Sequence, residues 1–317
     1  MKRIIALLCA CLILCLAACG QTEPDQPDDT TSTETVGRQT NEPEQQNTVR
    51  TMEDMVNVDG VTAVTAQSFA QPTEGVVAYK VSYETTNGKL VADVVLPNDY
   101  ADKNYPVLLY FPEIGNINID ALAAYYARYG FIAIRPYARG YNESEGVRDF
   151  GGSRDLADAQ KLLQIFDTAD FVADSKVFVV GSSEGSVVAL RLFAEDTQNR
   201  ISGCAVTDVI TDVHAFAVAR GENVQSLLAA LIGNTYEEAP EEYALRSAVT
   251  FSEKLAGRPL LLLHYQQNTS FPVEQTDSLY ELLQDAGNCT YQKLDIRTSD
   301  FNGTGLQTLL VWLRAQI

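Results

Sequence analysis

The residues with the clearest chemical meaning form a G-x-S-x-G pattern, Gly181-Ser182-Ser183-Glu184-Gly185. The apolar residues VFVV precede the pattern and VVALRL follows it, so the sequence predicts a buried strand, a sharp turn and an amphipathic helix. Glycines on both sides of such a turn let the helix approach the strand closely. A serine at the tip of this turn is the nucleophile of many acyl-transfer sites, so Ser183 is the candidate nucleophile.

A nucleophilic serine needs a base, and histidine is the usual one. The chain has only two histidines, His214 and His264, and neither follows the last expected strand, where such a triad keeps its base. A Ser–Lys dyad with Lys293 is a further option. Two distant histidines without ligand spacing predict no zinc site, and we expect no cofactor.

Strands and helices are expected to alternate along most of the chain. The expected strands are 76–85, 89–96, 107–111, 131–135, 177–180, 202–206, 259–263 and 291–296, and the expected helices are 119–129, 155–170, 186–195, 272–286 and 306–315. This alternation predicts an α/β fold with a mostly parallel, doubly wound sheet and helices on both faces. Residues 208–257, after the sixth strand, are predicted to form a small helical insertion.

The chain resembles the catalytic domain of the prolyl oligopeptidase and dienelactone hydrolase branch of the α/β-hydrolases. The matching segments are YPVLLYF, YGFIAIRPYARGYNESEG, RDLADAQKLL, VFVVGSSEG, AVTD and PLLLLHYQQNTSFPVEQTDSLYELLQDAG, from about residue 75 to the C-terminus. The resemblance implies the α/β-hydrolase fold. It also implies that the loop from Arg139 to Gly146 is a pocket wall, although a plain surface connection is an equal alternative. Substrate class does not follow from this fold.

The oxyanion position departs from the family pattern. The family's His-Gly-Gly run is replaced by Pro112-Glu113-Ile114-Gly115, and the second backbone donor implied by the resemblance is the N–H of Glu184. A backbone donor survives such a substitution. The Glu113 carboxylate, however, would lie near a developing negative charge, which opposes catalysis.

The acid and base positions depart as well. By resemblance, Asn268 occupies the place of the family's aspartate, and Asp300 lies nearest the place of its histidine. An asparagine orients an imidazole but does not stabilise its charge, and an aspartate is about 2.5 pKa units weaker as a base than histidine. His264 and His214 are the alternative bases. The simpler interpretations are a structural histidine at the sheet edge for His264 and a satisfied or exposed one for His214.

The N-terminal residues predict export and anchoring. Residues 1–18 have the basic start and short apolar run of a signal peptide. The sequence Leu16-Ala17-Ala18-Cys19 resembles the lipobox of bacterial lipoproteins, which implies cleavage before Cys19 and its lipidation; a chance cysteine after an ordinary signal is the alternative. We expect residues 19–60 to be the lipidated cysteine and a disordered acidic tether, and 61–317 to be the hydrolase-like domain. The protein would then be held outside a bacterial cell membrane.

Charge and cysteine content bound the function further. The net charge of −19 argues against nucleic acid as a partner. Cys204 and Cys289 remain in the domain, and although an exported protein is permitted a disulfide, their apolar surroundings favour two separate buried thiols.

Three functions fit these observations. The leading hypothesis is a membrane-anchored, serine-hydrolase-like protein that has lost its triad and binds a small-molecule or peptide ligand, or a protein partner, at the elbow. The alternative is an active serine esterase or peptidase that uses Ser183 with His264 or His214. A third is an interaction module in which residues 208–257 contact another protein. The distance from each histidine ring to the Ser183 hydroxyl separates the first two.

Overall fold

The protein is described here from a computed structural model, which covers residues 48–71, 73–113, 118–297 and 301–317. The chain divides into two units, Met1–Gln45 and Gln46–Ile317, and every described residue belongs to the second. The signal segment, Cys19 and Asp300 lie outside the described residues, so the predictions that concern them remain predictions.

Within the described residues, nine strands form one sheet in the order β1-β2-β3-β5-β4-β6-β7-β8-β9. The strands are β1 (Val61–Gln67), β2 (Val76–Thr85), β3 (Gly88–Pro97), β4 (Val107–Phe111), β5 (Ile132–Pro136), β6 (Val177–Ser182), β7 (Ile201–Thr207), β8 (Leu260–Tyr265) and β9 (Cys289–Leu294). Pairing is antiparallel from β1 to β5 along this order and parallel from β5 to β9. The predicted mostly parallel α/β sheet is confirmed.

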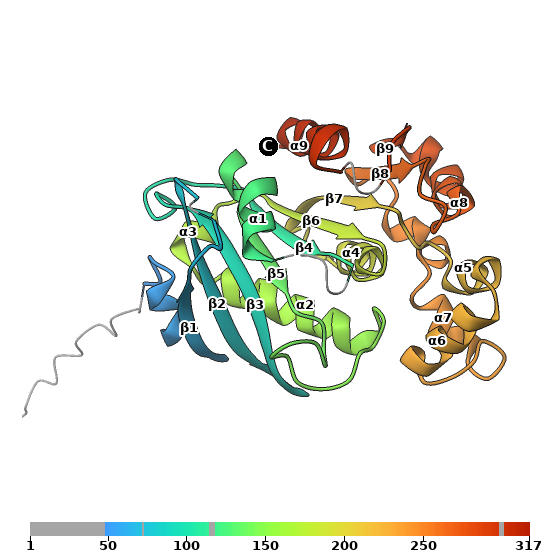
Figure 1. Cartoon of the computed structure of the whole chain (residues 1–317), viewed down its shortest axis with the longest axis horizontal. Coiled ribbons are helices and arrows are strands. Elements are labelled where there is room, and N and C mark those ends of the chain that lie inside the picture. Colours follow the sequence, from blue (N-terminus) through green and yellow to red (C-terminus); the bar gives the residue numbers. More distant parts are fainter. Residues whose placement is uncertain (1–47, 72, 114–117, 298–300) are drawn as a thin grey trace, which may run out of the picture. The chain divides into compact units, whose positions relative to one another are not determined.

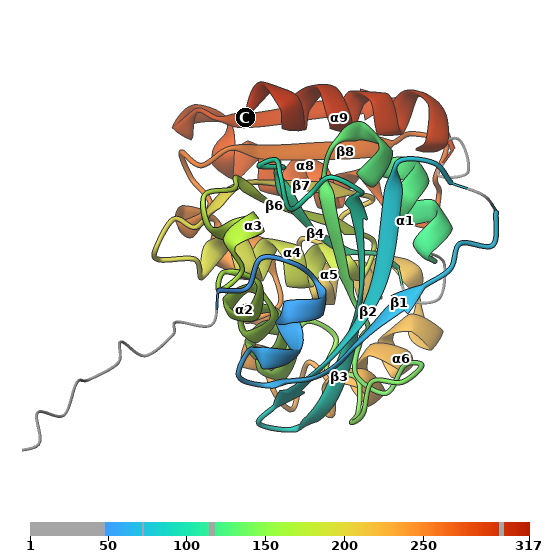
Figure 2. The same cartoon turned by 90° about the vertical axis from the view of Figure 1, so that its left-hand side faces the viewer.

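Helices cover both faces of the sheet (Figures 1 and 2). They are α1 (Ile119–Tyr125), α2 (Ser153–Phe166), α3 (Asp170–Ala173), α4 (Gly185–Ala194), α5 (Val213–Arg220), α6 (Glu222–Ile232), α7 (Pro240–Ala244), α8 (Val273–Leu283) and α9 (Leu306–Ala315). Short 3-10 helices are η1 (Glu53–Asn57), η2 (Ala127–Tyr129), η3 (Ala248–Thr250), η4 (Ser252–Lys254) and η5 (Gln284–Ala286), and η7 (Phe301–Gly305) is a short π-helix. Buried side chains of α2, α4 and α8 share one apolar cluster, and those of α1 and α9 share the cluster on the other face.

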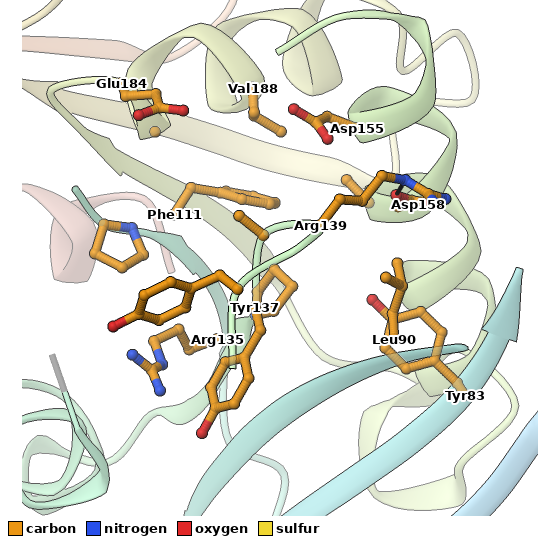
Figure 3. Close-up of a pocket in the computed structure, with 16 residues that line it drawn as sticks. Tyr83, Leu90, Phe111, Arg135, Tyr137, Arg139, Asp155, Asp158, Glu184 and Val188 are labelled. Atoms are coloured by element: carbon orange, nitrogen blue, oxygen red, sulfur yellow. Dashed lines mark hydrogen bonds and ion pairs between the residues drawn. The ribbon is translucent and has the colours of Figure 1, made fainter. Parts of the chain in front are cut away.

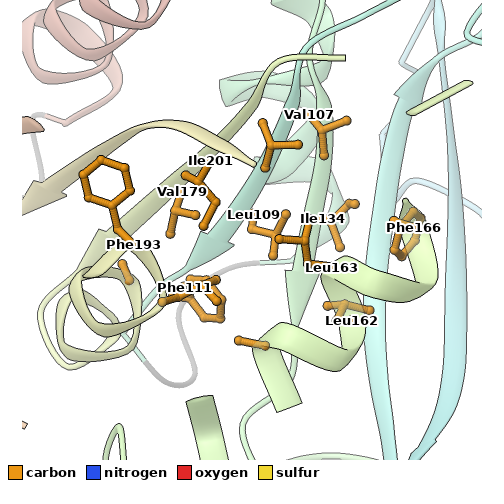
Figure 4. Packing of buried hydrophobic residues seen from close by; sticks show 14 of the residues in the cluster. Val107, Leu109, Phe111, Ile134, Leu162, Leu163, Phe166, Val179, Phe193 and Ile201 are labelled. Carbon is orange, nitrogen blue, oxygen red and sulfur yellow. The ribbon is translucent and has the colours of Figure 1, made fainter. Parts of the chain in front are cut away.

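The central strands are buried on both faces, as their continuous apolar sequences predict. In β4, Val107, Leu109 and Phe111 belong to the cluster beneath α2 and α4, whereas Leu108 and Tyr110 belong to the cluster beneath α1 and α9. Figure 4 shows the first cluster, where Leu162 and Leu163 of α2 face these strands. This core fixes the ends of β4 and β6; the elbow follows the end of β6 and packs against the end of β4.

The folded unit begins earlier than the boundary expected from composition. Residues 48–60 were expected to belong to the tether, but Met52 and Met55 are completely buried in the core. The N–H of Met52 donates to the Tyr100 hydroxyl at 2.8 Å, and Val49 forms an isolated bridge to Ala169. Two large apolar side chains in a polar stretch were enough to attach it to the domain. The edge strand β1 was also not predicted, because its residues are half-exposed and alternate weakly.

The insertion after β7 is helical, as expected, and follows the sixth of the predicted strands. It contains α5, α6 and α7, which lie together at the right of Figure 1 and pack around a small apolar cluster that also includes Phe150 and, from α4, Val187. Arg246, which is only 1% exposed, follows α7 and donates to the carbonyl oxygen of Asp149 at 3.0 Å. This buried contact joins the insertion to the loop before α2.

The two domain cysteines are free thiols. Cys204 of β7 and Cys289 of β9 both pair with Leu260, so one strand lies between them. Two strand spacings, about 9–10 Å, exceed the Cα separation that a disulfide spans. Cys204 is buried and Cys289 is half-buried. Among the described helices, none is long and apolar enough to cross a bilayer.

Candidate active site

The G-x-S-x-G segment forms a tight turn between β6 and α4. Ser183 has a φ of 53°, in the left-handed region that non-glycine residues seldom adopt. Its N–H donates to the Thr207 carbonyl oxygen at 3.1 Å, and its own carbonyl oxygen accepts from the Ser186 hydroxyl at 2.6 Å. A Cβ on Gly185 would lie 1.9 Å from the Phe111 carbonyl oxygen, so only glycine fits there. The backbone therefore has the nucleophile-elbow geometry that the sequence predicts.

The Ser183 side chain lacks an activating partner within the described residues. Ser183 is 5% exposed, and no hydrogen bond joins its hydroxyl to any described group. In particular, neither histidine makes a hydrogen bond to it. A serine hydroxyl without a base is a weak nucleophile.

His264 lies in β8, opposite Lys293 of β9 in the sheet register, and is 4% exposed. Burial lowers the pKa of its imidazole below 6.5, against the opposing effect of Asp208 and Asp277. Lys293 itself is paired with Asp277 of α8 at 3.0 Å, so its ammonium is engaged away from the elbow. His264 is thus a buried, largely neutral ring in an acidic setting between β8, β9 and α8.

His214 lies in α5 of the insertion and faces that insertion. Its ring stacks on Tyr236 with 3.6 Å between centroids and meets Tyr243 edge-on. The same three residues line a pocket among α5, α6 and the segment before α7, to which no elbow residue contributes. The structure therefore does not bring His214 to Ser183.

Asn268, at the expected acid position, is hydrogen-bonded to a carboxylate. Its side-chain amide donates to Asp208 at 2.6 Å. Asp208 follows β7, is 1% exposed, and has a φ of 47°. The acid region therefore retains a buried carboxylate, Asp208, at the end of the strand next to the elbow strand.

The oxyanion position retains its backbone donor but is surrounded by charge. Among the described residues, the Glu184 N–H has no acceptor, so it is available to an oxyanion. The Glu184 side chain forms an ion pair with Arg148. Burial raises the pKa of the Glu184 carboxyl, Arg148 lowers it, and the nearby Glu113 raises it further. Arg148 offsets the charge of Glu184, so the Glu113 carboxylate is the group that opposes the build-up of negative charge at the oxyanion position.

A cavity lies beside the elbow, between α4, α2 and the ends of β2 to β5 (Figure 3). We call it the side pocket. Its lining includes Tyr83, Phe111, Arg139, Asp155, Glu184 and Val188. Most of the wall is apolar or aromatic, with a few charged groups, which is the usual character of a small-molecule site. Arg139 belongs to this wall, as expected for its loop, and forms an ion pair with Asp158 at 2.6 Å.

Sequence reasoning did not single out four residues that the structure places around the elbow, namely Tyr83, Arg148, Asp155 and Asp208. Asp208 had a usable signal, because AVTD ends a strand expected to neighbour the elbow strand. The other three come from distant segments, so their position near the elbow could not be predicted without the tertiary structure. Among the described residues, no group of three His, Cys, Asp or Glu side chains is arranged to hold a metal ion.

Comparisons with known proteins agree with this fold. No family model matches the chain. The uncharacterized peptidase YtmA of Bacillus subtilis (strain 168) is 23% identical over 228 residues, which are 70% of this chain and 85% of that protein. An acetyl xylan esterase from Paenibacillus sp. R4 aligns with a TM-score of 0.61 and 15% identity, over 82% of this chain and 91% of the esterase.

Two further solved structures have similar scores. An S-formylglutathione hydrolase from Agrobacterium tumefaciens aligns with a TM-score of 0.60 and 12% identity, over 81% of this chain and 99% of its own. The acylaminoacyl peptidase of Pyrococcus horikoshii aligns with a TM-score of 0.62 and 15% identity, over 76% of this chain and 41% of its own. With the sheet order and the elbow already described, these likenesses show that the chain has the α/β-hydrolase fold.

Proposed function

We propose that this protein is an extracytoplasmic lipoprotein whose serine-hydrolase-like domain has lost its catalytic triad and acts by binding a ligand beside the elbow. The observation on which this rests is that the Ser183 hydroxyl hydrogen-bonds to neither histidine, while His214 is stacked on Tyr236 in the insertion. The similar proteins are named as esterases and peptidases, so hydrolysis of an ester or peptide bond is the activity that we propose has been lost here.

The charge distribution supports the same proposal. A working triad needs a base that accepts the serine proton and returns it to the leaving group. The chain offers Asn268 at the acid position, paired with Asp208, and no histidine after the last strand. Glu113 adds negative charge where a tetrahedral intermediate would need positive potential, whereas Arg148 offsets that of Glu184. Each change lowers the rate, and together they favour binding without turnover.

Anchoring through Cys19 is the second half of the proposal. Two or more acyl chains on one residue hold a protein stably on a membrane, whereas one chain does not. We expect the native protein to partition with membranes, and Cys19→Ser to release or mislocalise it. Detergent phase partitioning of cells that express the two forms tests this, and finding the mature chain soluble with Cys19 as a free thiol would contradict it.

A fluorophosphonate probe tests the loss of the triad. The probe reacts with an activated serine, and activation needs a base within about 2.6–3.2 Å. We expect little or no labelling of the purified domain at pH 7.5, and hydrolysis of p-nitrophenyl acetate no faster in the native chain than in Ser183→Ala. An unrelated active serine hydrolase, labelled under the same conditions, is the positive control.

The active-hydrolase alternative makes the opposite prediction. Rapid stoichiometric labelling at Ser183 that is abolished by His264→Ala or by His214→Ala would establish an active enzyme and identify its base. Labelling at Ser183 that neither change affects would also overturn the proposal, because some other group would then be activating the serine.

A further inference from the structure

We propose that the side pocket binds a small organic ammonium, with the Asp155 carboxylate as counter-charge and the Tyr83 hydroxyl as a second polar contact. This deepens the proposed function, since it names the ligand class for the site beside the elbow. It requires only the pocket and does not depend on whether Ser183 is active.

The charges around the side pocket leave one carboxylate over. Arg135 pairs with Asp93 at 2.5 Å and Arg139 pairs with Asp158 at 2.6 Å. Glu184 pairs with Arg148. These pairs are neutral, but Asp155, which also lines the pocket, is in no ion pair with a described residue. Its carboxylate accepts one hydrogen bond, from the Gly151 N–H at 2.8 Å.

The remaining charged groups near Asp155 do not neutralise it by contact. Asp149, Asp158 and Glu184 are acidic neighbours, and together with burial they raise the pKa of Asp155 to about 6. Arg154 and Arg191 are the nearby cations, but Arg154 pairs with Asp149 at 3.1 Å and the Arg191 guanidinium donates to the Gly151 carbonyl oxygen at 2.6 Å. At pH 7.5 Asp155 is therefore mainly ionised and gives the pocket a negative charge that no ion pair with a described residue neutralises.

The second observation is independent of charge. The hydroxyl of Tyr83 is fully buried, lines the same pocket, and has no hydrogen-bond partner among the described residues. A buried polar group without a partner is costly, so such groups are uncommon unless a ligand or ion completes them. Figure 3 shows the Tyr83 ring reaching from β2 toward Arg139 and Asp158, and Asp155 reaching from α2 toward Val188.

The rest of the wall suits a cation with a short apolar stem. Leu90, Phe111, Ala159 and Val188 supply apolar surface. The rings of Tyr83 and Tyr141 supply aromatic surface that attracts a cation at close range, and the Tyr137 ring already holds the Arg135 guanidinium in this way, 4.5 Å from its centroid. An alkylammonium group, whether a free amine or the end of a lysine side chain, offers the apolar stem, the positive charge and the N–H donors that this lining would receive.

The test uses n-butylammonium as probe and n-butanol as its neutral match of the same length. We expect the purified domain to bind n-butylammonium at least about tenfold more tightly than n-butanol at pH 7.5, as followed by NMR titration or calorimetry. Asp155→Asn keeps an acceptor for the Gly151 N–H and should remove about tenfold of the n-butylammonium affinity while leaving n-butanol unchanged. Tyr83→Phe keeps the ring and should weaken n-butylammonium about fivefold.

Several results would overturn the ammonium site. Equal binding of the two probes, no binding of n-butylammonium, or affinity unchanged by Asp155→Asn would each do so, provided that the circular dichroism of the variants matches the native chain and that their melting temperatures are no lower. Asp102→Asn, at an exposed carboxylate, is the matched control and should leave binding unchanged.

A second arm separates the two sources of the ligand. N-acetyl-lysine N-methylamide presents the same ammonium on a blocked residue, so binding comparable to n-butylammonium assigns the pocket to lysine side chains. Binding about tenfold weaker assigns it to free amines, and either result supports the ammonium site. Fluorophosphonate labelling of Ser183 would contradict the lost triad without affecting these titrations, so the two proposals fail separately.

Discussion

The elbow and the region that should hold the acid and base are built differently. The elbow is held by backbone and packing, through Gly185 against the Phe111 carbonyl and the Ser183 N–H on the Thr207 carbonyl. The acid and base region, at the ends of β7 to β9, depends on polar side chains such as Asp208, Asn268 and His264. The first has the geometry of a nucleophile elbow; in the second, the described residues bring no histidine into hydrogen-bond contact with Ser183.

Under the proposed function, this contrast explains how a chain can lose its chemistry and keep its fold. A change at the elbow disturbs close-packed core, where one misplaced atom costs stability. Replacing a triad side chain removes activity, yet the scaffold around it can remain folded. A hydrolase-like scaffold can therefore keep a pocket and an elbow for a new use. Substitutions at the elbow should destabilise the fold through packing, whereas substitutions in the acid region should act through charge.

The largest effect is expected at Gly185. A Cβ there would meet the Phe111 carbonyl oxygen at 1.9 Å and its carbon at 2.5 Å, and neither backbone atom can move without disturbing β4. We expect Gly185→Ala to lower the free energy of unfolding by about 3 kcal/mol or more, or to prevent folding. Urea denaturation followed by circular dichroism measures this. Ser183→Ala, two residues earlier, is the control and should change stability by less than about 0.5 kcal/mol. A Gly185→Ala variant that folds with a free energy of unfolding within about 1 kcal/mol of the native value would contradict the prediction.

Asn268→Asp tests the acid region. It would place a second carboxylate beside Asp208, where the amide now donates at 2.6 Å. Two carboxylates this close cannot both ionise, so one pKa rises. The cost should be about 2–3 kcal/mol at pH 7.5 and should diminish toward pH 4.5, because the folded state then holds the extra proton. The proposed loss of the triad predicts no ester turnover from this change alone.

Gln267→Glu is the matched control for this change. The Gln267 amide donates to Asp295 at 2.9 Å, which is the same kind of pair, but both residues are exposed. Water screens the new repulsion, so the cost should stay below about 0.5 kcal/mol. Equal costs for the two variants would mean that burial of Asp208 is unimportant. A clear gain of ester turnover in Asn268→Asp would show that a histidine is already in place.

Much of the fold could be predicted because its signals are local. Strand β4 and helix α9 have the predicted bounds, since an apolar run between turn residues and a regular helical period are both readable in a short window. Strand β1 and the buried Met52 and Met55 were missed because their attachment depends on partners far along the chain.

The site was predictable in part for the same reason. Ser183 and its turn are encoded in five neighbouring residues, so the elbow was readable. The side pocket joins Tyr83, Arg139 and Asp155 from three separate segments, and no local pattern reports that Arg139 is neutralised by Asp158 whereas Asp155 is not. Which charges compensate one another is a property of the folded chain.

The ionised Asp155 carboxylate should lower the free energy of unfolding. Its pKa is raised from 3.8 to about 6 in the folded state, so the folded state binds more protons than the unfolded state between these values. The carboxylate therefore destabilises the fold increasingly as the pH rises from 4 to 6, and fully above that. We expect Asp155→Asn to raise the free energy of unfolding by about 1–2 kcal/mol at pH 7.5 and hardly at all at pH 4. Urea titrations at both pH values, with Asp102→Asn as control, check this; a loss of stability at pH 7.5 would mean that Arg191 compensates the charge after all.

The smallest effect concerns Ser183 itself. Its φ of 53° costs a non-glycine residue about 1 kcal/mol, and its hydroxyl makes no hydrogen bond to a described residue that would repay the strain. Ser183→Gly should therefore raise the free energy of unfolding by about 0.5–1 kcal/mol relative to Ser183→Ala, because glycine adopts this conformation without strain even after its larger unfolded-state entropy is counted. Paired urea titrations of the two variants resolve a difference of this size. If glycine is instead less stable than alanine, the turn is held by something other than the glycines and the core around it, and the contrast between a packed elbow and a polar acid region would have to be abandoned.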